Sequence, residues 1–272
     1  MVQVVRNIYN YRELLLTLAW KEITVRYKQA YLGVAWTVLK PVMLMLIFTL
    51  VRSFVGIDSG DIPYPVLTFA ALLPWTFFQE STSQGVGSVV QNAMLVKKIY
   101  FPREIFPLAA VLTKLMELGI NFFILAGLMI FYQMAPTANV LWVLPILLYT
   151  IIVSLTISLA GSAMNVYYRD ISSLLPVTLS LLMYLSPVIY PLSLVKKTLL
   201  DNQAAGEWSV TFYNLYLLNP LVGIIDGFQK SLLQGVAPDF SAMFPGMILT
   251  LVLLPFSYIS FKKAESYFAD VI

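Results

Sequence analysis

The chain of 272 residues has no cysteine and no histidine. Without cysteine it can form no disulfide, no thiolate metal site and no cysteine nucleophile, and without histidine it lacks the commonest general base and metal ligand. The net charge of +3 is accompanied by no lysine-rich run or basic motif helix, so we expect no nucleic-acid partner. These shortages disfavour most catalytic classes, and we expect no catalytic residue, no metal site and no cofactor bound by this chain.

Charge is scarce as well. Charged residues make up 11% and hydrophobic residues 59% of the chain, against about 25% and about 45 to 50% in soluble proteins. The first 28 residues contain seven charged side chains and no apolar stretch typical of a signal peptide. No repeat or linker divides the sequence. The composition predicts an all-α membrane protein with one domain over residues 1–272.

Six windows are long and apolar enough for membrane spans, because a bilayer core about 30 Å thick needs about 20 apolar residues per helix. The boundaries are good to a few residues. The windows are 33–56, 64–87, 104–134, 140–166, 174–190 and 244–261.

Residues 1–30 precede the first window and show a different pattern. Ile8, Tyr11, Leu15 and Leu18 recur at helical spacing, with polar side chains on the opposite face. This predicts an amphipathic helix lying in the membrane interface, although a solvated helix is an alternative. Arg26 departs from the pattern because it projects near the apolar face, from which a long cationic side chain can reach the lipid headgroups.

The distribution of Lys and Arg predicts the orientation, because these residues accumulate on the cytoplasmic side of a membrane. With both termini in the cytoplasm, 12 of the 17 Lys and Arg residues are cytoplasmic. Only Arg52, Lys196, Lys197 and Lys230 fall outside, and Lys114 lies within a span. The prediction is a multi-pass membrane protein whose N- and C-termini are cytoplasmic.

The segment 192–243 contains an apolar stretch that could be taken for a seventh span. It carries Asp226, Lys230 and the helix-breaking pair Asn219-Pro220. A seventh span would also place Lys262 and Lys263 outside. We therefore predict an external region in which two short helices enter the outer leaflet and return, with the Asn219-Pro220 turn buried against protein.

The chain resembles the permease subunit of bacterial polysaccharide ABC exporters, which move O-antigen, capsule and teichoic acid chains. The resemblance covers nearly the whole chain and is carried by five segments in order: RYKQAYLGVAWTVLKP, YFPREIFPLA, YYRDI, YLSPVIYPLS and YNLYLLNPLVGIIDGFQ. It implies six spans, an N-terminal interface helix, cytoplasmic coupling helices and two re-entrant helices before the last span. The residues by themselves predict the same architecture, and the resemblance implies that its membrane is the bacterial cytoplasmic (inner) membrane.

The resemblance also implies partners. The chain has no phosphate-binding loop, since Gly85-Val86-Gly87 is not followed by the required lysine. A separate nucleotide-binding subunit would therefore use ATP and Mg, and the family likeness implies two such subunits and a second copy of this chain. We expect the ATPase to be contacted, directly or through support, by Trp20, Lys21, Arg26, Lys97, Lys98, Tyr100, Arg103, Tyr168, Arg169 and Asp170. The plainer interpretation is that these cations only fix topology and the tyrosines only anchor the interface.

Aromatic side chains are plausible contacts for a lipid-linked glycan, because sugar rings combine apolar C–H faces with hydroxyls. The residues that we expect along a substrate channel are Tyr31, Trp36, Trp75, Phe78, Tyr184 and Tyr190. Ordinary packing and membrane-interface anchoring are the alternative roles.

Glu80, Lys114 and Glu117 are the ionisable residues deepest in the predicted spans, where isolated charge is costly. Lys114 and Glu117 lie three apart on one helical face and can pair with each other; lining a pore or locking a dimer is the functional alternative. The sequence leaves open a permease for a drug or lipid, or an ion-coupled transporter or membrane enzyme. The lack of histidine and the scarcity of buried acids disfavour a proton relay.

Overall fold

The structure is a computed structural model that describes residues 9–28, 33–56, 62–201 and 207–272. Every regular element in these ranges is a helix, in agreement with the predicted all-α class. Four of the described helical segments are long and apolar enough to cross a membrane: Ala35–Val55, Ile105–Phe131, Ala138–Tyr167 and Phe240–Glu265.

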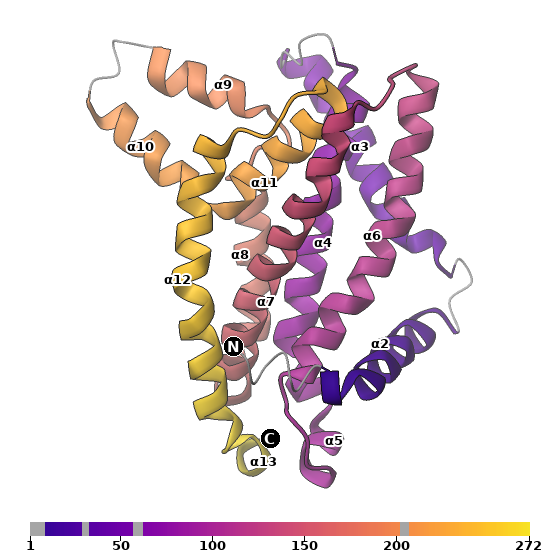
Figure 1. The fold of residues 1–272 in the computed structure, drawn as a ribbon, viewed down its shortest axis with the longest axis vertical. Coiled ribbons are helices and arrows are strands. Elements are labelled where there is room, and N and C mark those ends of the chain that lie inside the picture. The colour runs from indigo at the N-terminus through magenta and orange to yellow at the C-terminus, as the bar shows by residue number, and fades with distance from the viewer. Residues whose placement is uncertain (1–8, 29–32, 57–61, 202–206) are drawn as a thin grey trace.

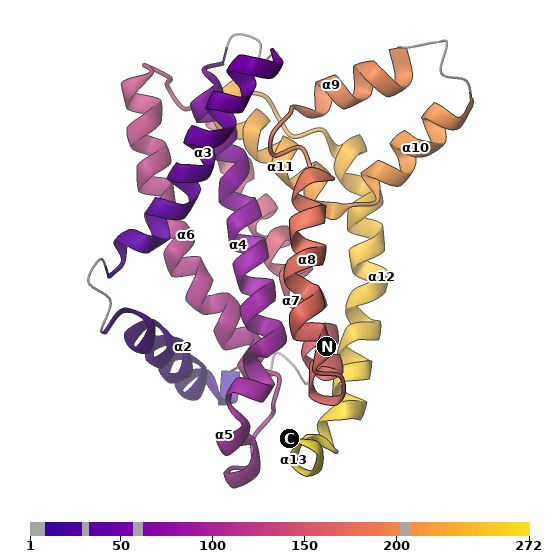
Figure 2. The same cartoon turned by 180° about the vertical axis from the view of Figure 1, so that it is seen from behind.

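Helix α4 (Tyr64–Gln91) forms the centre of the bundle (Figures 1 and 2). Every residue from Val66 to Phe78 is buried. Because α4 is enclosed by protein, its side chains need not be uniformly apolar. It is not one of the four segments that are long and apolar enough to cross a membrane. The helices that pack around it are α3 (Ala35–Val55), α6 (Ile105–Phe131), α7 (Val143–Tyr167), α8 (Asp170–Tyr184) and α11 (Pro220–Gln229).

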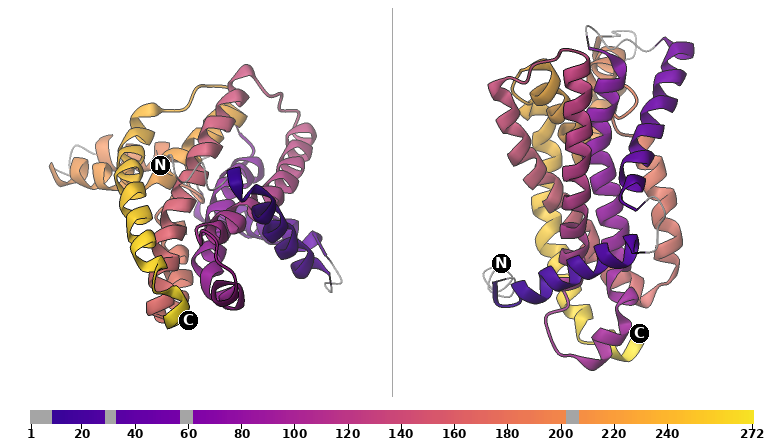
Figure 3. Two further views of the ribbon diagram at one scale, coloured as in Figure 1. Left: turned by 60° about the horizontal axis from the view of Figure 1, so that its bottom comes forward. Right: turned by 90° about the vertical axis from the view of Figure 1, so that its right-hand side faces the viewer.

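The two ends of the bundle differ. At the lower end in Figure 1, called the α5 end, lie the C-terminus, the short helices α5 (Ala93–Lys98) and α13 (Phe268–Val271), and the lower part of α12 (Phe240–Glu265). Helix α2 (Arg12–Tyr27) lies across the bundle near this end, as Figure 3 shows. At the opposite end, α9 (Leu192–Lys196) and α10 (Glu207–Leu217) project sideways.

Helix α2 packs on α6 with the face that the sequence pattern predicts. Leu18 is buried and Leu15 is partly buried, whereas Thr17 and Lys21 are exposed. Trp20, on the outer side, is also exposed. The helix therefore presents apolar surface both to the bundle and outward. Residues 1–8 of the predicted interface helix lie outside the described residues.

Helices occupy all six predicted windows, but the fifth is displaced. Helix α8 begins at Asp170 and ends at Tyr184, whereas the sequence predicted 174–190. Its early end follows from Pro187 and Pro191, because a proline lacks the N–H that a helix needs and restricts the residue before it. In the fourth window the 3-10 helix η1 (Ala138–Trp142) leads directly into α7.

The predicted break at Asn219-Pro220 separates α10 from α11. The Asn219 side chain accepts a hydrogen bond from the Leu221 N–H (3.1 Å) and donates one to the Ser186 hydroxyl (2.9 Å), while Pro220 begins α11. Residues 221–229 are all buried. Contact between α11 and α12 is close enough to require glycine, because a Cβ at Gly223 would lie 2.6 Å from the Met243 Cα.

We predict that Gly223→Val destabilises the protein by about 1 to 3 kcal/mol, because the added atoms overpack the junction of α11 and α12. Thermal unfolding in detergent, followed by tryptophan emission, would measure the change. Gly119→Ala is the matched control, since a Cβ at Gly119 meets no atom within 4 Å. Equal melting temperatures for the Gly223 variant and wild type would contradict the close contact.

Candidate functional site

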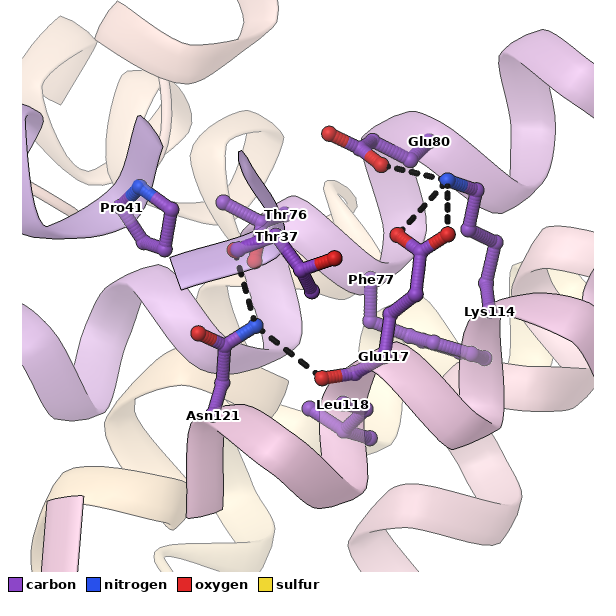
Figure 4. Close-up of a pocket in the computed structure, with 9 residues that line it drawn as sticks. All are labelled: Thr37, Pro41, Thr76, Phe77, Glu80, Lys114, Glu117, Leu118 and Asn121. Carbon is purple, nitrogen blue, oxygen red and sulfur yellow. Dashed lines mark hydrogen bonds and ion pairs between the residues drawn. The ribbon is translucent and has the colours of Figure 1, made fainter. Parts of the chain in front are cut away.

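Five charged side chains from α2, α3, α4 and α6 meet inside the bundle and are called the ion cluster: Arg26, Lys40, Glu80, Lys114 and Glu117. The Lys114 ammonium lies 2.6 Å from a Glu80 oxygen and 2.8 Å from a Glu117 oxygen (Figure 4). The other Glu80 oxygen is 3.0 Å from the Lys40 ammonium, and Glu117 is 2.7 Å from the Arg26 guanidinium. These ion pairs join the four helices.

Neutral side chains complete the links between the helices. The Tyr27 hydroxyl donates to Glu117 (3.2 Å) and lies 2.7 Å from the Thr37 hydroxyl. Arg26 also donates to the Gln84 amide oxygen (2.8 Å). Asn121 donates to the backbone carbonyl of Glu117 at 3.1 Å, and Figure 4 shows it directed also toward Thr37. The end of α2 is thus tied to α3, α4 and α6.

Glu22, one turn before Arg26, adds a further contact between α2 and the bundle. Its carboxylate accepts hydrogen bonds from the Gln84 amide and from the Thr113 hydroxyl. Burial raises the pKa of Glu22 above its ordinary value, because desolvation disfavours the charged carboxylate. Gln84 therefore contacts both Glu22 and Arg26 of α2.

Burial makes an unpaired charge in the ion cluster costly in free energy. Lys114 is 3% exposed and Glu117 is 8% exposed. Removing one partner of such a pair costs about 3 to 5 kcal/mol, because the remaining charge is buried without compensation. In the two outer pairs the acids, Glu117 and Glu80, are more buried than their cations, Arg26 and Lys40, which are partly exposed. The cluster thus has a closed inner side and an open outer side.

Three hollows adjoin the ion cluster. The innermost is a small cavity of about 20 Å³ beside Asn121 and Thr76, large enough for one water molecule. A second, of about 240 Å³, extends from Glu117 to Trp36. The third and most open has about 440 Å³ and lies on the side of Arg26, Lys40 and Lys114. Charged groups of the cluster are therefore accessible to a ligand from outside.

The predicted pairing of Lys114 with Glu117 is confirmed, and the structure adds Glu80 to it. Arg26, which we expect to contact or support the ATPase, is held by Glu117 and Gln84. Its departure from the amphipathic pattern was the signal for this inward contact. Sequence reasoning missed the pairing of Lys40 with Glu80, because the two lie on different helices with no spacing rule between them.

Most of the residues expected at the ATPase contact are exposed. Tyr100 is 97% exposed and follows α5 at the tip of the bundle. The other exposed members of the set are Trp20, Lys21, Arg26, Lys97, Lys98, Tyr168, Arg169 and Asp170.

Arg103 differs, because its polar groups are engaged within the chain. Its backbone N–H donates to the Glu265 carboxylate (2.7 Å), and its guanidinium donates to the carbonyls of Val96 (3.0 Å) and Glu265 (3.3 Å). The Lys262 ammonium bridges Glu265 (2.7 Å) and the buried Glu104 (2.5 Å). Arg103 therefore anchors the segment that follows α5 to the end of α12.

The aromatic residues expected along a channel divide into two groups. Trp75 and Phe78 are 0% and 1% exposed and belong to the core, so the expectation that they line a channel is wrong for this conformation. The reason is that α4 is enclosed on all sides by other helices. Trp36 and Tyr184 are exposed, and the partly buried Tyr190 donates its hydroxyl to the Tyr184 carbonyl (2.8 Å). Tyr31 lies outside the described residues.

Comparison with known proteins gives a consistent result. Residues 13–233 match the family described as ABC-2 type transporter. The chain is 29% identical over 273 residues to the O-antigen export system permease protein RfbA of Myxococcus xanthus, covering 100% of both chains. A protein of the same name from Klebsiella pneumoniae is 25% identical over 96% of this chain and 95% of its own. The polysialic acid transport protein KpsM of Escherichia coli is 23% identical over 82% of this chain and 84% of its own.

We predict that Lys114→Met and Glu117→Met each destabilise the protein by about 3 to 5 kcal/mol, since each leaves a buried charge unpaired. The double variant should lose clearly less than the sum of the two, because it removes both members of the buried pair. Unfolding by denaturant in detergent would measure the three free energies. Lys97→Met, at an exposed position, serves as the control, and additive losses would contradict the direct coupling.

Proposed function

The chain belongs to the ABC-2 type transporter family, and we propose that it is the membrane permease subunit of an ATP-driven exporter of lipid-linked polysaccharide. The observation that carries this proposal is the end-to-end match with an O-antigen export permease, which leaves no part of either chain unaligned. The match with a polysialic acid transport protein supports a polysaccharide as the common cargo. The permease itself is not the enzyme, and a partner subunit supplies ATP hydrolysis.

In the proposed assembly, two copies of this chain associate with two nucleotide-binding subunits, which bind ATP and Mg. The glycan channel lies between the two copies, because a two-fold pair can enclose a path that one bundle need not contain. Helices α3 and α8 expose apolar side chains that suit membrane lipid or a second copy, among them Leu46, Leu50, Val177 and Leu181.

The proposed topology has six spans, formed by α3, α4, α6, α7, α8 and α12, in the bacterial cytoplasmic membrane. The α5 end faces the cytoplasm, so that both termini are cytoplasmic, and α2 lies in the interface. Exposed cations at this end support the orientation: Lys97, Lys98, Arg169 and Lys263. Helices α10 and α11 form the re-entrant pair on the outer side, and their junction at Asn219-Pro220 contacts protein.

The ATPase docks on the α5 end, at the tip that carries Lys97, Lys98 and Tyr100 and at the start of α8. Arg103 connects this tip to α12 through Glu265. Closure of the ATPase subunits would therefore move α5 and α12 together rather than bend the segment that follows α5. Such rigid coupling lets a distant site shift the bundle between two arrangements.

We predict that Arg169→Ala combined with Asp170→Ala uncouples the exporter. Export of lipid-linked glycan should fall about tenfold, within the range of coupling free energies, while the complex continues to hydrolyse ATP and the permease still inserts in the membrane. The measurement compares glycan at the cell surface with ATP turnover of the purified complex. The control is Lys196→Ala with Lys197→Ala, two exposed cations at the opposite end; undiminished export by the first variant would refute the docking site.

Trp36→Ala combined with Tyr184→Ala should slow export of a long glycan without lowering permease abundance, because both side chains are exposed. Trp75→Ala is the contrast, since removing this buried side chain costs about 3 to 5 kcal/mol and should reduce abundance. Export assays with parallel immunoblots separate the two effects. A loss of abundance in the first variant that matched its loss of export would assign those aromatics to packing.

A further inference from the structure

A hollow of about 450 Å³ lies between α2 and α6 and is called the α2–α6 groove. Apart from one threonine its lining is apolar: Leu16, Thr17, Ala19, Trp20 and Ile23 of α2, with Leu112 and Met116 of α6. Glu22 and Arg26, which carry the polar contacts of α2 with the bundle, are not part of this lining. Helix α2 thus has a polar edge that joins the ion cluster and an apolar edge along the groove.

The large apolar side chains of the α2–α6 groove are only partly covered by the rest of the chain. Trp20 is 64% exposed and Met116 is 49% exposed, and Leu16 is exposed as well. Leu18 and Ala19, in contrast, are buried where α2 packs on α6. Burial of exposed apolar area is favourable, so the groove is suited to an apolar ligand.

The α2–α6 groove continues into a surface that suits membrane lipid. Met116, Phe123 and Ile130 follow one another at seven-residue intervals, so they lie on one face of α6. All three are exposed, and α6 is long and apolar enough to cross a membrane. Because Met116 belongs to both surfaces, a hydrocarbon chain in the bilayer can extend along α6 into the groove.

The charges of α2 favour an anionic lipid headgroup. In residues 12–28 the exposed charged side chains are Arg12, Glu13, Lys21, Arg26 and Lys28, four cations and one acid. Arg12 lies one helical turn before Leu16, and Lys21 lies one turn after Thr17. Cations therefore stand at both ends of the α2 edge of the groove, and basic residues at a membrane surface attract anionic lipids.

A second copy of this chain is a less suitable ligand for the same groove. A two-fold contact through this surface would use the same patch on both copies. The exposed cations of two α2 helices would then face each other, and like charges placed together disfavour association.

We propose that the α2–α6 groove binds an acyl chain of an anionic bilayer phospholipid, whose phosphate contacts Lys21. This inference rests on the proposed position of α2 in the membrane interface and is independent of the cargo. It assigns Trp20 and Lys21, which we expect from the sequence to contact or support the ATPase, to the membrane. The bound lipid holds α2 against α6, and Arg26 transmits that restraint to Glu117 in the ion cluster.

The test uses the complete permease–ATPase complex in nanodiscs of phosphatidylcholine with a minor fraction of phosphatidylglycerol. One of the two lipids carries bromine on its acyl chains, which quenches the emission of a tryptophan that it contacts. The difference between wild type and Trp20→Phe isolates the signal of Trp20. Per mole of lipid, brominated phosphatidylglycerol should quench Trp20 about fivefold more effectively than brominated phosphatidylcholine, the effect of one basic residue near the headgroup.

Lys21→Gln should abolish this preference for the anionic lipid. Lys28→Gln is the matched control, because it removes an exposed cation of the same segment that lies beyond the groove. It should keep the preference within about twofold of wild type, since the field of a surface charge is screened over about a Debye length. Equal losses in the two variants would reduce the effect to the net charge of α2 and would overturn the proposal.

Three other results would also overturn it. Absence of quenching at Trp20 by either lipid would show that protein covers the groove. Equal quenching by both lipids in wild type would show ordinary contact with bulk lipid. Displacement of brominated phosphatidylglycerol by unlabelled polyprenyl phosphate at equal mole fraction would assign the groove to a carrier lipid. Glycan export by the same complex, measured in parallel, reports separately on the proposed function.

Discussion

The arrangement of four helices depends on the ion pairs that the Lys114 ammonium forms. It lies between carboxylates from α4 and α6, and those carboxylates in turn hold Lys40 of α3 and Arg26 of α2. Charge at this depth is costly unless each group has a partner. A packing of these helices that separated the partners would leave a buried charge unpaired, which favours the observed arrangement.

A second set of polar contacts, made of hydrogen bonds and ion pairs, has the same effect at the α5 end. Arg103 and Lys262 converge on Glu265 and fix the segment after α5 to the end of α12. The first cluster thus controls the position of α2, and the second controls the position of the exposed tip around Tyr100. Helix α2 and the tip proposed to bind the ATPase are therefore both attached firmly to the bundle, as transmission of a displacement requires.

Much of the architecture could be predicted from the sequence, because hydrophobic length and helix-breaking residues act locally. The windows of α3, α6, α7 and α12 agree with the structure, and the break between α10 and α11 occurs at Asn219-Pro220 as expected. The limits of α8 were less well predicted, since its end depends on the prolines after Tyr184. The site was predicted in part: spacing on one helix gave Lys114 with Glu117, but no local pattern relates Lys40 to Glu80 or Arg26 to Glu117.

The sequence by itself determined that this is a helical membrane protein, where its helices break, and which transporter family it resembles, because these properties follow from composition, local spacing and ordered segments. Only the tertiary structure decided which helix is enclosed and which charges meet. Burial of Trp75 and Phe78 depends on the helices around α4. The open hollow beside Arg26, Lys40 and Lys114 likewise exists only because α2, α3, α4 and α6 bring residues far apart in the chain to one place, where attraction between opposite charges offsets their loss of solvent.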